Sequence, residues 1–133
     1  MKTVILDTNV LIDNIHGYTP WLKTLIEKQA YHLVIPTIVV AEYLTDLQVE
    51  TEVGKKRSHE YLSWFVKQDL TEEIAYVLGT ILRRKTYTQK AGVADLIIAA
   101  TAIHLNAQLA TRNKADFAKI PDLVFFKPEK LYD

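Results

Sequence analysis

The sequence contains no cysteine. Disulfide bonds, iron–sulfur clusters, thiolate zinc sites and cysteine nucleophiles are therefore excluded. Glycine and proline are also scarce, with four of each among 133 residues, and 49% of the residues are hydrophobic. This composition is typical of a packed globular domain and excludes a disordered or fibrous chain. Because this length suffices for one core of ordinary size, we expect a single domain over residues 1–133.

The chain also lacks net charge, because 16 Lys and Arg balance 16 Asp and Glu. A uniformly basic nucleic-acid binder is excluded, but a local basic surface is not.

No apolar run reaches a membrane-spanning length without interruption, since the longest, residues 91–111, contains Asp95 and His104. The first apolar run reaches Asp7 after three residues, too soon for a secretory signal. We therefore expect no membrane segment and a cytoplasmic location.

Apolar periodicity predicts strands that alternate with helices. Strands are expected at residues 3–6, 33–35, 108–111 and 123–126. Helices are expected at residues 21–30, 37–44, 58–66, 71–82, 92–105 and 113–119, with Thr37 as an N-cap. Strands joined through helices form a parallel sheet with helices on its faces, so the sequence predicts an α/β fold.

Each long apolar run contains one acidic residue. Asp7 is the only charge in residues 4–12, Glu42 in residues 32–45 and Asp95 in residues 91–111. A buried carboxylate persists when it is paired, used as a cap or bound to a metal. Asp7 follows the first predicted strand, and Asp116 follows the strand at 108–111, so both lie beyond carboxyl ends, where open α/β sheets bind ligands. We expect all four acids to meet at one edge of the sheet.

Each acid also has a structural interpretation. Asp7 could cap a helix that begins at Thr8, and Asp95 could be a first-turn acid favoured by the helix dipole. Glu42 could pair with Arg112, and Asp116 could be a surface residue. Four acids around one sheet edge are harder to explain in this way, so we favour a functional site.

Carboxylates without cysteine or a helical histidine pair favour a hard cation such as Mg²⁺, with Mn²⁺ as the alternative. The four histidines share no spacing typical of metal ligands. A cation held by carboxylates usually keeps waters and joins substrate phosphate oxygens to the protein. The acids therefore indicate chemistry on a phosphate ester.

Four segments resemble the PIN-domain ribonucleases and, within them, the VapC-type toxins of prokaryotic toxin–antitoxin pairs. The segments are residues 4–12, Pro36-Thr37 with Glu42, residues 94–102 and residues 109–117. The resemblance covers nearly the whole chain in the family's order. It implies a three-layer α/β/α fold with a central parallel sheet of four or five strands and an acidic pocket at its carboxyl edge.

The resemblance also assigns roles to residues. Asp7, Glu42, Asp95 and Asp116 take the four acidic, catalytic and metal-binding places. Asp7 and Asp95 would be direct ligands of one or two Mg²⁺ ions. Hydrogen bonds from Thr8 or Asn9, and from Thr111 or Asn113, would orient the carboxylates. Asn113 stands where many relatives have an acid or a hydroxyl residue, which leaves the number of ions open.

The implied activity is hydrolysis of RNA by water that a metal activates, and the implied partners are a cognate antitoxin and a second copy of the chain. Lys90, Arg112 and Tyr87 are the expected RNA contacts. An aromatic-rich set of residues could form a groove for an antitoxin helix or a dimer contact, and packing in the core is the equal alternative for most of them: Tyr43, Leu47, Tyr61, Leu62, Trp64 and Phe65.

Other functions stay open at this point. A PIN nuclease of RNA processing or repair outside a toxin pair, or one that acts on DNA, would carry the same acids. A non-catalytic binding module with a PIN fold is disfavoured by the presence of all four. A phosphatase is a weaker interpretation, because Asp7-Thr8-Asn9 lacks the second aspartate of an aspartyl phosphatase. A receiver domain is also weaker, because it has its phosphoacceptor on a middle strand.

Overall fold

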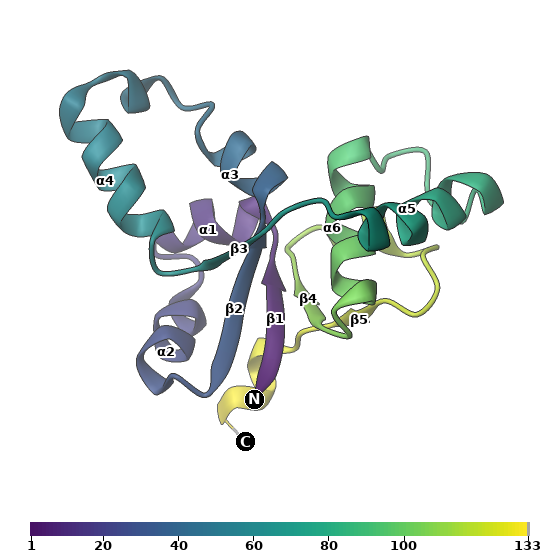
Figure 1. The fold of residues 1–133 in the computed structure, drawn as a ribbon. Coiled ribbons are helices and arrows are strands. Elements are labelled where there is room, and N and C mark those ends of the chain that lie inside the picture. The colour runs from purple at the N-terminus through teal and green to yellow at the C-terminus, as the bar shows by residue number, and fades with distance from the viewer. Residues whose placement is uncertain (133) are drawn as a thin grey trace.

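A parallel sheet forms the centre of the protein. The structure, a computed structural model, describes residues 1–132 apart from the side chains of Leu47 and Tyr132. The strands pair in the order β3-β2-β1-β4-β5, all parallel (Figure 1). They are β1 (Lys2–Leu6), β2 (Tyr31–Pro36), β3 (Val66–Gln68), β4 (Gln108–Ala110) and β5 (Val124–Phe125).

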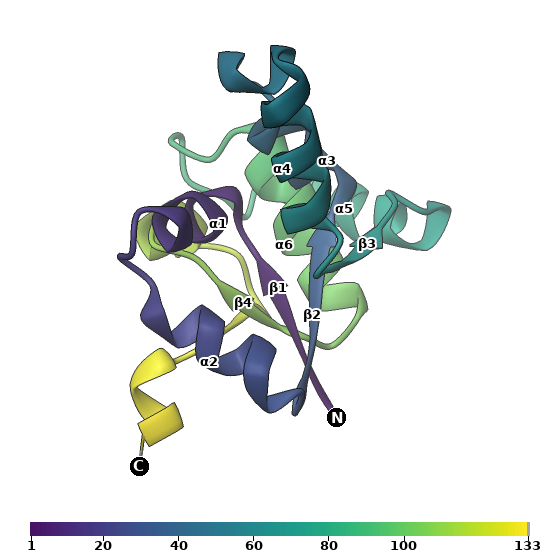
Figure 2. The same ribbon diagram turned by 90° about the vertical axis from the view of Figure 1, so that its left-hand side faces the viewer.

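Helices cover both faces of the sheet. They are α1 (Thr8–Ile15), α2 (Pro20–Lys28), α3 (Thr37–Tyr43), α4 (Glu52–Leu62), α5 (Glu72–Arg84) and α6 (Val93–His104), with 3₁₀ turns η1 (Leu47–Glu50), η2 (Lys114–Phe117) and η3 (Pro128–Tyr132). Figures 1 and 2 show α1 and α2 on one face and α6, with α5 outside it, on the other. The predicted three-layer α/β/α fold is confirmed. Within residues 1–132, no helix is long and apolar enough to cross a membrane.

The central strands are apolar and buried toward their carboxyl ends because both of their faces are covered there. Val4, Ile5 and Leu6 of β1 have no exposed surface, and Ala99 and Ala100 of α6 are equally buried. The small alanine side chains let α6 lie close against β1, β2 and β4. Burial on both faces produces near-continuous apolar strands, and the pattern is typical of parallel sheets.

One segment differs from the prediction. Residues 58–66 were expected to be a helix, but α4 begins at Glu52 and ends at Leu62, and Val66 already belongs to β3. The helix begins early because Thr51 caps it, its Oγ1 accepting a hydrogen bond from the Gly54 N–H at 2.9 Å. Since α4 is largely polar and exposed, it carries little of the apolar periodicity on which the prediction depended.

Two smaller expectations also need correction. Thr37 is the first residue of α3, and the N-cap is Pro36, which forms no side-chain cap bond. The short helix expected at residues 113–119 has 3₁₀ geometry and is confined to η2, Lys114–Phe117. Thr71 caps α5, its Oγ1 accepting the Ile74 N–H at 3.3 Å, and α6 lies where the apolar run predicts a buried helix.

The parallel sheet determines where functional residues gather. Asp7 directly follows β1, α3 directly follows β2, and Thr111 directly follows β4. The Asp7 N–H donates to the Ala110 carbonyl at 3.0 Å, so the ends of β1 and β4 are joined at this edge. The carboxyl ends of three neighbouring strands therefore lie together.

Candidate active site

The four predicted acids lie near one another at the carboxyl edge of the sheet. Asp7 precedes α1, Glu42 lies near the end of α3, Asp95 lies in the first turn of α6, and Asp116 lies in η2. Burial raises the pKa of Asp7, and the nearby Asp95 and Glu42 carboxylates raise it further. Burial also raises the pKa of Asp95, with added repulsion from Asp116 and Glu42. These mutual effects define one acidic site built from four separate elements.

Asp7 is the most constrained of the four acids, with only 5% of its surface exposed. Its Oδ1 accepts the Thr8 N–H at 2.7 Å, while its Oδ2 accepts the Thr111 hydroxyl at 2.8 Å and the Asn9 amide at 3.1 Å. The bonds from Thr111 and Thr8 favour the charged form and partly oppose the rise in pKa caused by burial. Oδ1 retains a free lone pair for a ligand.

The capping role of Asp7 does not account for its surroundings. Asp7 caps α1, as its structural interpretation proposed. In the described part of the chain, however, none of the four acids forms an ion pair; the pairs there are Lys23–Glu27, Lys55–Glu52 and Arg112–Asp13. A helix cap alone leaves the repulsion among four carboxylates uncompensated, which favours a bound cation.

Glu42 is held through a threonine, not through an arginine. Its Oε1 accepts the Thr8 hydroxyl at 2.7 Å, which joins α3 to α1. The alternative pairing with Arg112 is wrong, because the Arg112 guanidinium donates to Asp13 Oδ1 at 2.7 Å. Asp13 is only 7% exposed and was not singled out from the sequence, since it lies one residue beyond the apolar run that drew attention to Asp7.

Asp95 and Asp116 are positioned by backbone contacts. Asp95 Oδ2 accepts the Gly92 N–H at 3.1 Å, which closes the first turn of α6. The Asp116 carbonyl accepts the Thr88 hydroxyl at 3.2 Å, which ties η2 to the loop before α6. Each acid therefore has a defined backbone support while its carboxylate stays at least partly exposed to the site.

A polar network connects the loop after β4 to Asp7. The Arg112 N–H donates to Asn9 Oδ1 at 3.1 Å, and the Asn113 N–H donates to the Thr111 hydroxyl oxygen at 3.1 Å. The structure thus places Thr8, Asn9 and Thr111 around the carboxylates through their side chains. Asn113 takes part through its backbone, and its side chain makes none of the described hydrogen bonds.

The family model of the PIN domain matches residues 4–123. The chain belongs to the PIN domain family. Its similarity to solved structures covers nearly the whole length of both chains. A toxin–antitoxin complex from Klebsiella pneumoniae is similar at 30% identity and a TM-score of 0.70, covering 94% of this chain and 97% of that chain. No curated protein gives a sequence match.

Two further complexes support the same grouping. VapBC2 from Rickettsia felis, bound to a DNA fragment from its promoter, is 27% identical with a TM-score of 0.69, covering 93% of this chain and 97% of that chain. FitAcB from Neisseria gonorrhoeae is 27% identical with a TM-score of 0.68, covering 95% and 98%. The resemblance drawn from the four sequence motifs is confirmed.

The donor set of this PIN domain fits a hard cation. Carboxylate oxygens dominate the site, and no basic side chain of the described ion pairs compensates them. In residues 1–132, no three acidic or histidine side chains are close enough to form a complete ligand cluster. Mg²⁺ commonly takes only one or two protein carboxylates and keeps several waters, so it does not require such a cluster.

The three expected RNA contacts lie in different surroundings. Lys90 is exposed in the loop that leads into α6 and Asp95. Tyr87 is half-buried and packs against the core. Arg112 remains 62% exposed at its side chain, yet its guanidinium is engaged by Asp13. Of the expected RNA contacts, Lys90 is therefore the one whose charge is not engaged by another described residue.

The Thr111 hydroxyl gives a test of how Asp7 is oriented. Thr111→Val removes the 2.8 Å bond to Asp7 Oδ2, so we expect the Asp7 pKa to rise further and any metal-dependent activity to fall roughly tenfold. Thr111→Ser retains the hydroxyl and should retain most activity. The activity and the thermal unfolding of both variants are measured, which separates an effect on the orientation of Asp7 from an effect on folding. An equal loss of activity in Thr111→Val and Thr111→Ser would contradict the role assigned to the hydroxyl.

Proposed function

We propose that this PIN domain is a Mg²⁺-dependent endoribonuclease and the toxin of a toxin–antitoxin pair. The observation that carries this proposal is the convergence of Asp7, Glu42, Asp95 and Asp116 at one sheet edge with no described ion-pair partner. The similarity to toxin–antitoxin complexes supports the biological role. Mn²⁺ is the alternative ion, and one or two ions can be accommodated in the proposal.

The residues of the site have different proposed roles in hydrolysis. Asp7 and Asp95 would hold Mg²⁺ directly, while Glu42 and Asp116 would act through water or complete a second ion site. When bound, Mg²⁺ supplies positive charge that activates a water and neutralises the phosphodiester. The Thr111 hydroxyl, which donates to Asp7 Oδ2 at 2.8 Å, would fix the orientation of the Asp7 carboxylate.

Incubation with total cellular RNA tests the activity. We expect cleavage with Mg²⁺, loss of cleavage with EDTA, and products that carry a 5′ phosphate and a 3′ hydroxyl. Mapping of the cut ends measures this outcome. Ends with a 2′,3′-cyclic phosphate, or cleavage that survives EDTA, would contradict the mechanism. Single-stranded DNA in a parallel reaction tests the choice of RNA as substrate.

Lys90 should contribute an electrostatic contact to RNA. Lys90→Gln is expected to weaken RNA binding and to reduce the slope of log K against log salt by about 0.7, the value for one lost phosphate contact on a single strand. Binding is measured in an Asp95→Asn background, where cleavage is expected to be absent. Lys23→Gln on the distant helix α2 is the matched control, and an equal change in both variants would reject the assignment.

Arg112 is unsuitable for the same test. Its replacement would leave Asp13, 7% exposed, without its partner, so a loss of RNA binding could reflect a loss of stability. Pairing Arg112→Gln with Asp13→Asn removes both charges and keeps the comparison interpretable.

A groove beside Glu42 supports the antitoxin as partner. It has a volume of about 770 Å³ and runs between α1, α3, η1 and α4. Ile15 and Val53 line it and are exposed, while Tyr43 and Tyr61 form its inner wall, their ring centroids 5.6 Å apart. An apolar helix face could lie there with a basic side chain directed at Glu42.

The structure changes which aromatic residues belong to this surface. Tyr43 and Tyr61 line the groove, as expected. Leu62 and Phe65 are buried in the core, which removes them from any docking surface, and Trp64 is exposed outside the groove. The side chain of Leu47 lies outside the described part of the structure.

Ile15→Glu tests the groove as the antitoxin site. We expect it to weaken neutralisation by the antitoxin at least roughly tenfold, because a charge would be buried against an apolar helix, while RNA cleavage without antitoxin is unchanged. Tyr76→Glu, at an exposed aromatic on α5, is the control. Cleavage assays with increasing antitoxin measure both; neutralisation that is unaffected by Ile15→Glu would refute the groove.

The toxin role and the dimer are separate parts of the proposal. A toxin should arrest growth when expressed alone, and co-expression of an antitoxin should relieve the arrest. A PIN nuclease of RNA processing would cleave RNA in vitro without this pattern. The proposed homodimer is checked by the molar mass in solution from light scattering.

A further inference from the structure

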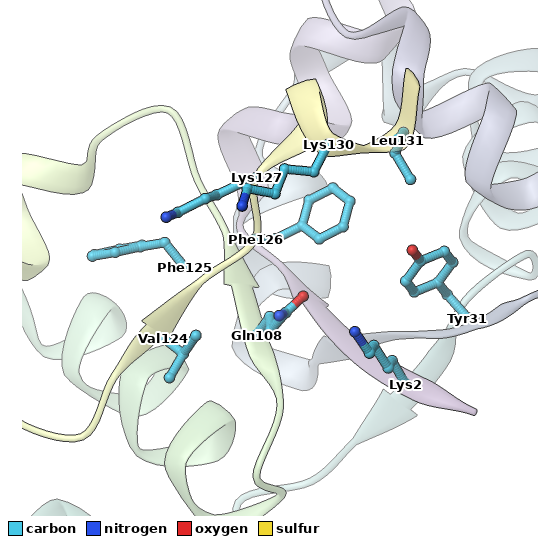
Figure 3. Close-up of a pocket in the computed structure, with 9 residues that line it drawn as sticks. All are labelled: Lys2, Tyr31, Gln108, Val124, Phe125, Phe126, Lys127, Lys130 and Leu131. Carbon is cyan, nitrogen blue, oxygen red and sulfur yellow. The ribbon is translucent and has the colours of Figure 1, made fainter. Parts of the chain in front are cut away.

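A second cavity lies at the opposite end of the sheet from the four acids (Figure 3). Its volume is about 360 Å³. Lys2, Tyr31 and Gln108, which line it, begin β1, β2 and β4, whereas Asp7 follows the far end of β1. At about 3.3 Å per residue, β1 separates the two sites by about 16 Å. The cavity therefore does not belong to the candidate active site.

The charged side chains that line the cavity within residues 1–132 are all positive. They are Lys2, Lys127 and Lys130, and none of the described lining residues is acidic. All three lysines are exposed, and none takes part in an ion pair within the described residues. Figure 3 shows Lys2 extending from β1 toward Gln108 and Tyr31. In a chain of zero net charge, this local excess attracts an anion.

Three aromatic residues also line the cavity: Tyr31, Phe125 and Phe126. Phe126 is 4% exposed and is fixed between Trp21 and Tyr31, whose ring centroids lie 5.4 Å and 6.0 Å away. Tyr31 and Phe125 are half-buried and line the cavity, and the Lys114 amine lies over the Phe125 ring, 5.8 Å from its centroid. The Gln108 amide and the Tyr31 hydroxyl, which line the cavity, make none of the described side-chain hydrogen bonds, so both groups have donors and acceptors for a ligand.

We propose that this cavity binds a phosphorylated nucleoside, either a free mononucleotide or the terminal nucleotide of an RNA strand. The lysines would take the phosphate, the rings would stack on the base, and the Gln108 amide would contact the base edge. The volume is near the lower limit of small-molecule pockets, which suits one nucleotide. The proposal is independent of the nuclease function, because no lining residue belongs to the acidic site.

Calorimetric titration in EDTA tests the site. The four ribonucleoside monophosphates, ribose 5-phosphate, inorganic phosphate and a 5′-phosphorylated tetranucleotide are the probes. We expect at least one nucleotide to bind with a stoichiometry of one, at least roughly fivefold more tightly than inorganic phosphate. The double variant Lys127→Gln with Lys130→Gln should weaken this binding about tenfold, and Lys23→Gln should not. Thermal unfolding verifies that the variants are folded.

Two further comparisons test the role of the aromatic wall and whether the ligand is a free nucleotide or a strand end. Phe125→Leu should bring nucleotide affinity toward that of ribose 5-phosphate, because the stacking surface is lost. A tetranucleotide that binds more tightly than the mononucleotide, and loses this binding in the double lysine variant, identifies the strand end as the ligand; equal or weaker binding identifies the free nucleotide. Absence of saturable binding, equal affinity for inorganic phosphate, or indifference to the lysine variants would overturn the proposal.

Discussion

Asp95→Asn is expected to reduce RNA cleavage at least about a hundredfold while the protein stays folded. Loss of a supporting residue around a metal ligand typically costs 10- to 100-fold, so loss of a direct ligand should cost at least as much. The amide oxygen of the substituted side chain can still accept the Gly92 N–H that Asp95 Oδ2 accepts at 3.1 Å. The helix cap therefore survives while the negative charge is removed.

Asp95 gives a cleaner test than Asp7. Asp7→Asn should also abolish cleavage, but Asp7 accepts hydrogen bonds from Thr8, Asn9 and Thr111 at its two oxygens. An amide cannot accept from all three, because one of its two terminal atoms only donates. We therefore expect Asp7→Asn to lose stability as well as activity.

Rates of RNA cleavage and circular-dichroism melts are measured together for this comparison. Asp69→Asn, at an exposed acid outside the site, is the matched control and should behave as the wild type. Retention of cleavage in Asp95→Asn would refute the assigned role of this acid. If Asp95→Asn unfolds, the structural interpretation of Asp95 as a first-turn residue of α6 would be favoured instead.

Mg²⁺ should raise the melting temperature of the wild-type protein by several degrees. The four carboxylates repel one another, and a divalent cation removes that repulsion. Binding at ten times the dissociation constant adds about 1.4 kcal/mol, and 1 kcal/mol corresponds to about 2–8 °C in domains near this size. Differential scanning calorimetry with and without Mg²⁺ measures the shift, and Asp95→Asn should show little of it.

The pH dependence of stability follows from the raised pKa values of Asp7 and Asp95. Both groups are protonated in the folded and unfolded states below the ordinary value of 3.8. As pH rises from there through the raised folded-state pKa, ionisation costs more in the folded protein, so their contribution to stability is lost. Without metal, Asp95→Asn should therefore melt above the wild type at pH 7, and this difference should disappear near pH 4.

The difference between the wild type and Asp95→Asn isolates this effect from other titrating groups. Asp69→Asn should show no such pH-dependent difference. A wild-type protein that Mg²⁺ does not stabilise, or a variant that melts below the wild type at pH 7 without metal, would show that repulsion among the acids is weak and would argue against the metal site.

Chemistry at the sheet edge was predictable because it depends on local sequence. A single acid in an apolar run, placed directly after a buried strand, is visible without any tertiary information, as Asp7 shows. Parallel strands then require that Asp7 and the residues after β4 share one edge. The same logic failed at α4 and β3, where a polar helix and a short edge strand leave almost no apolar pattern.

The sequence by itself determined the α/β order of elements and the four acids, since strand burial and residue type are encoded locally. Only the tertiary structure decided which side chains meet across the fold: Thr8 with Glu42, Thr111 with Asp7 and Arg112 with Asp13, pairs 34, 104 and 99 residues apart. It alone placed three lysines around aromatic rings at the far end of the sheet. Such long-range contacts depend on strand order and packing, which no local pattern specifies.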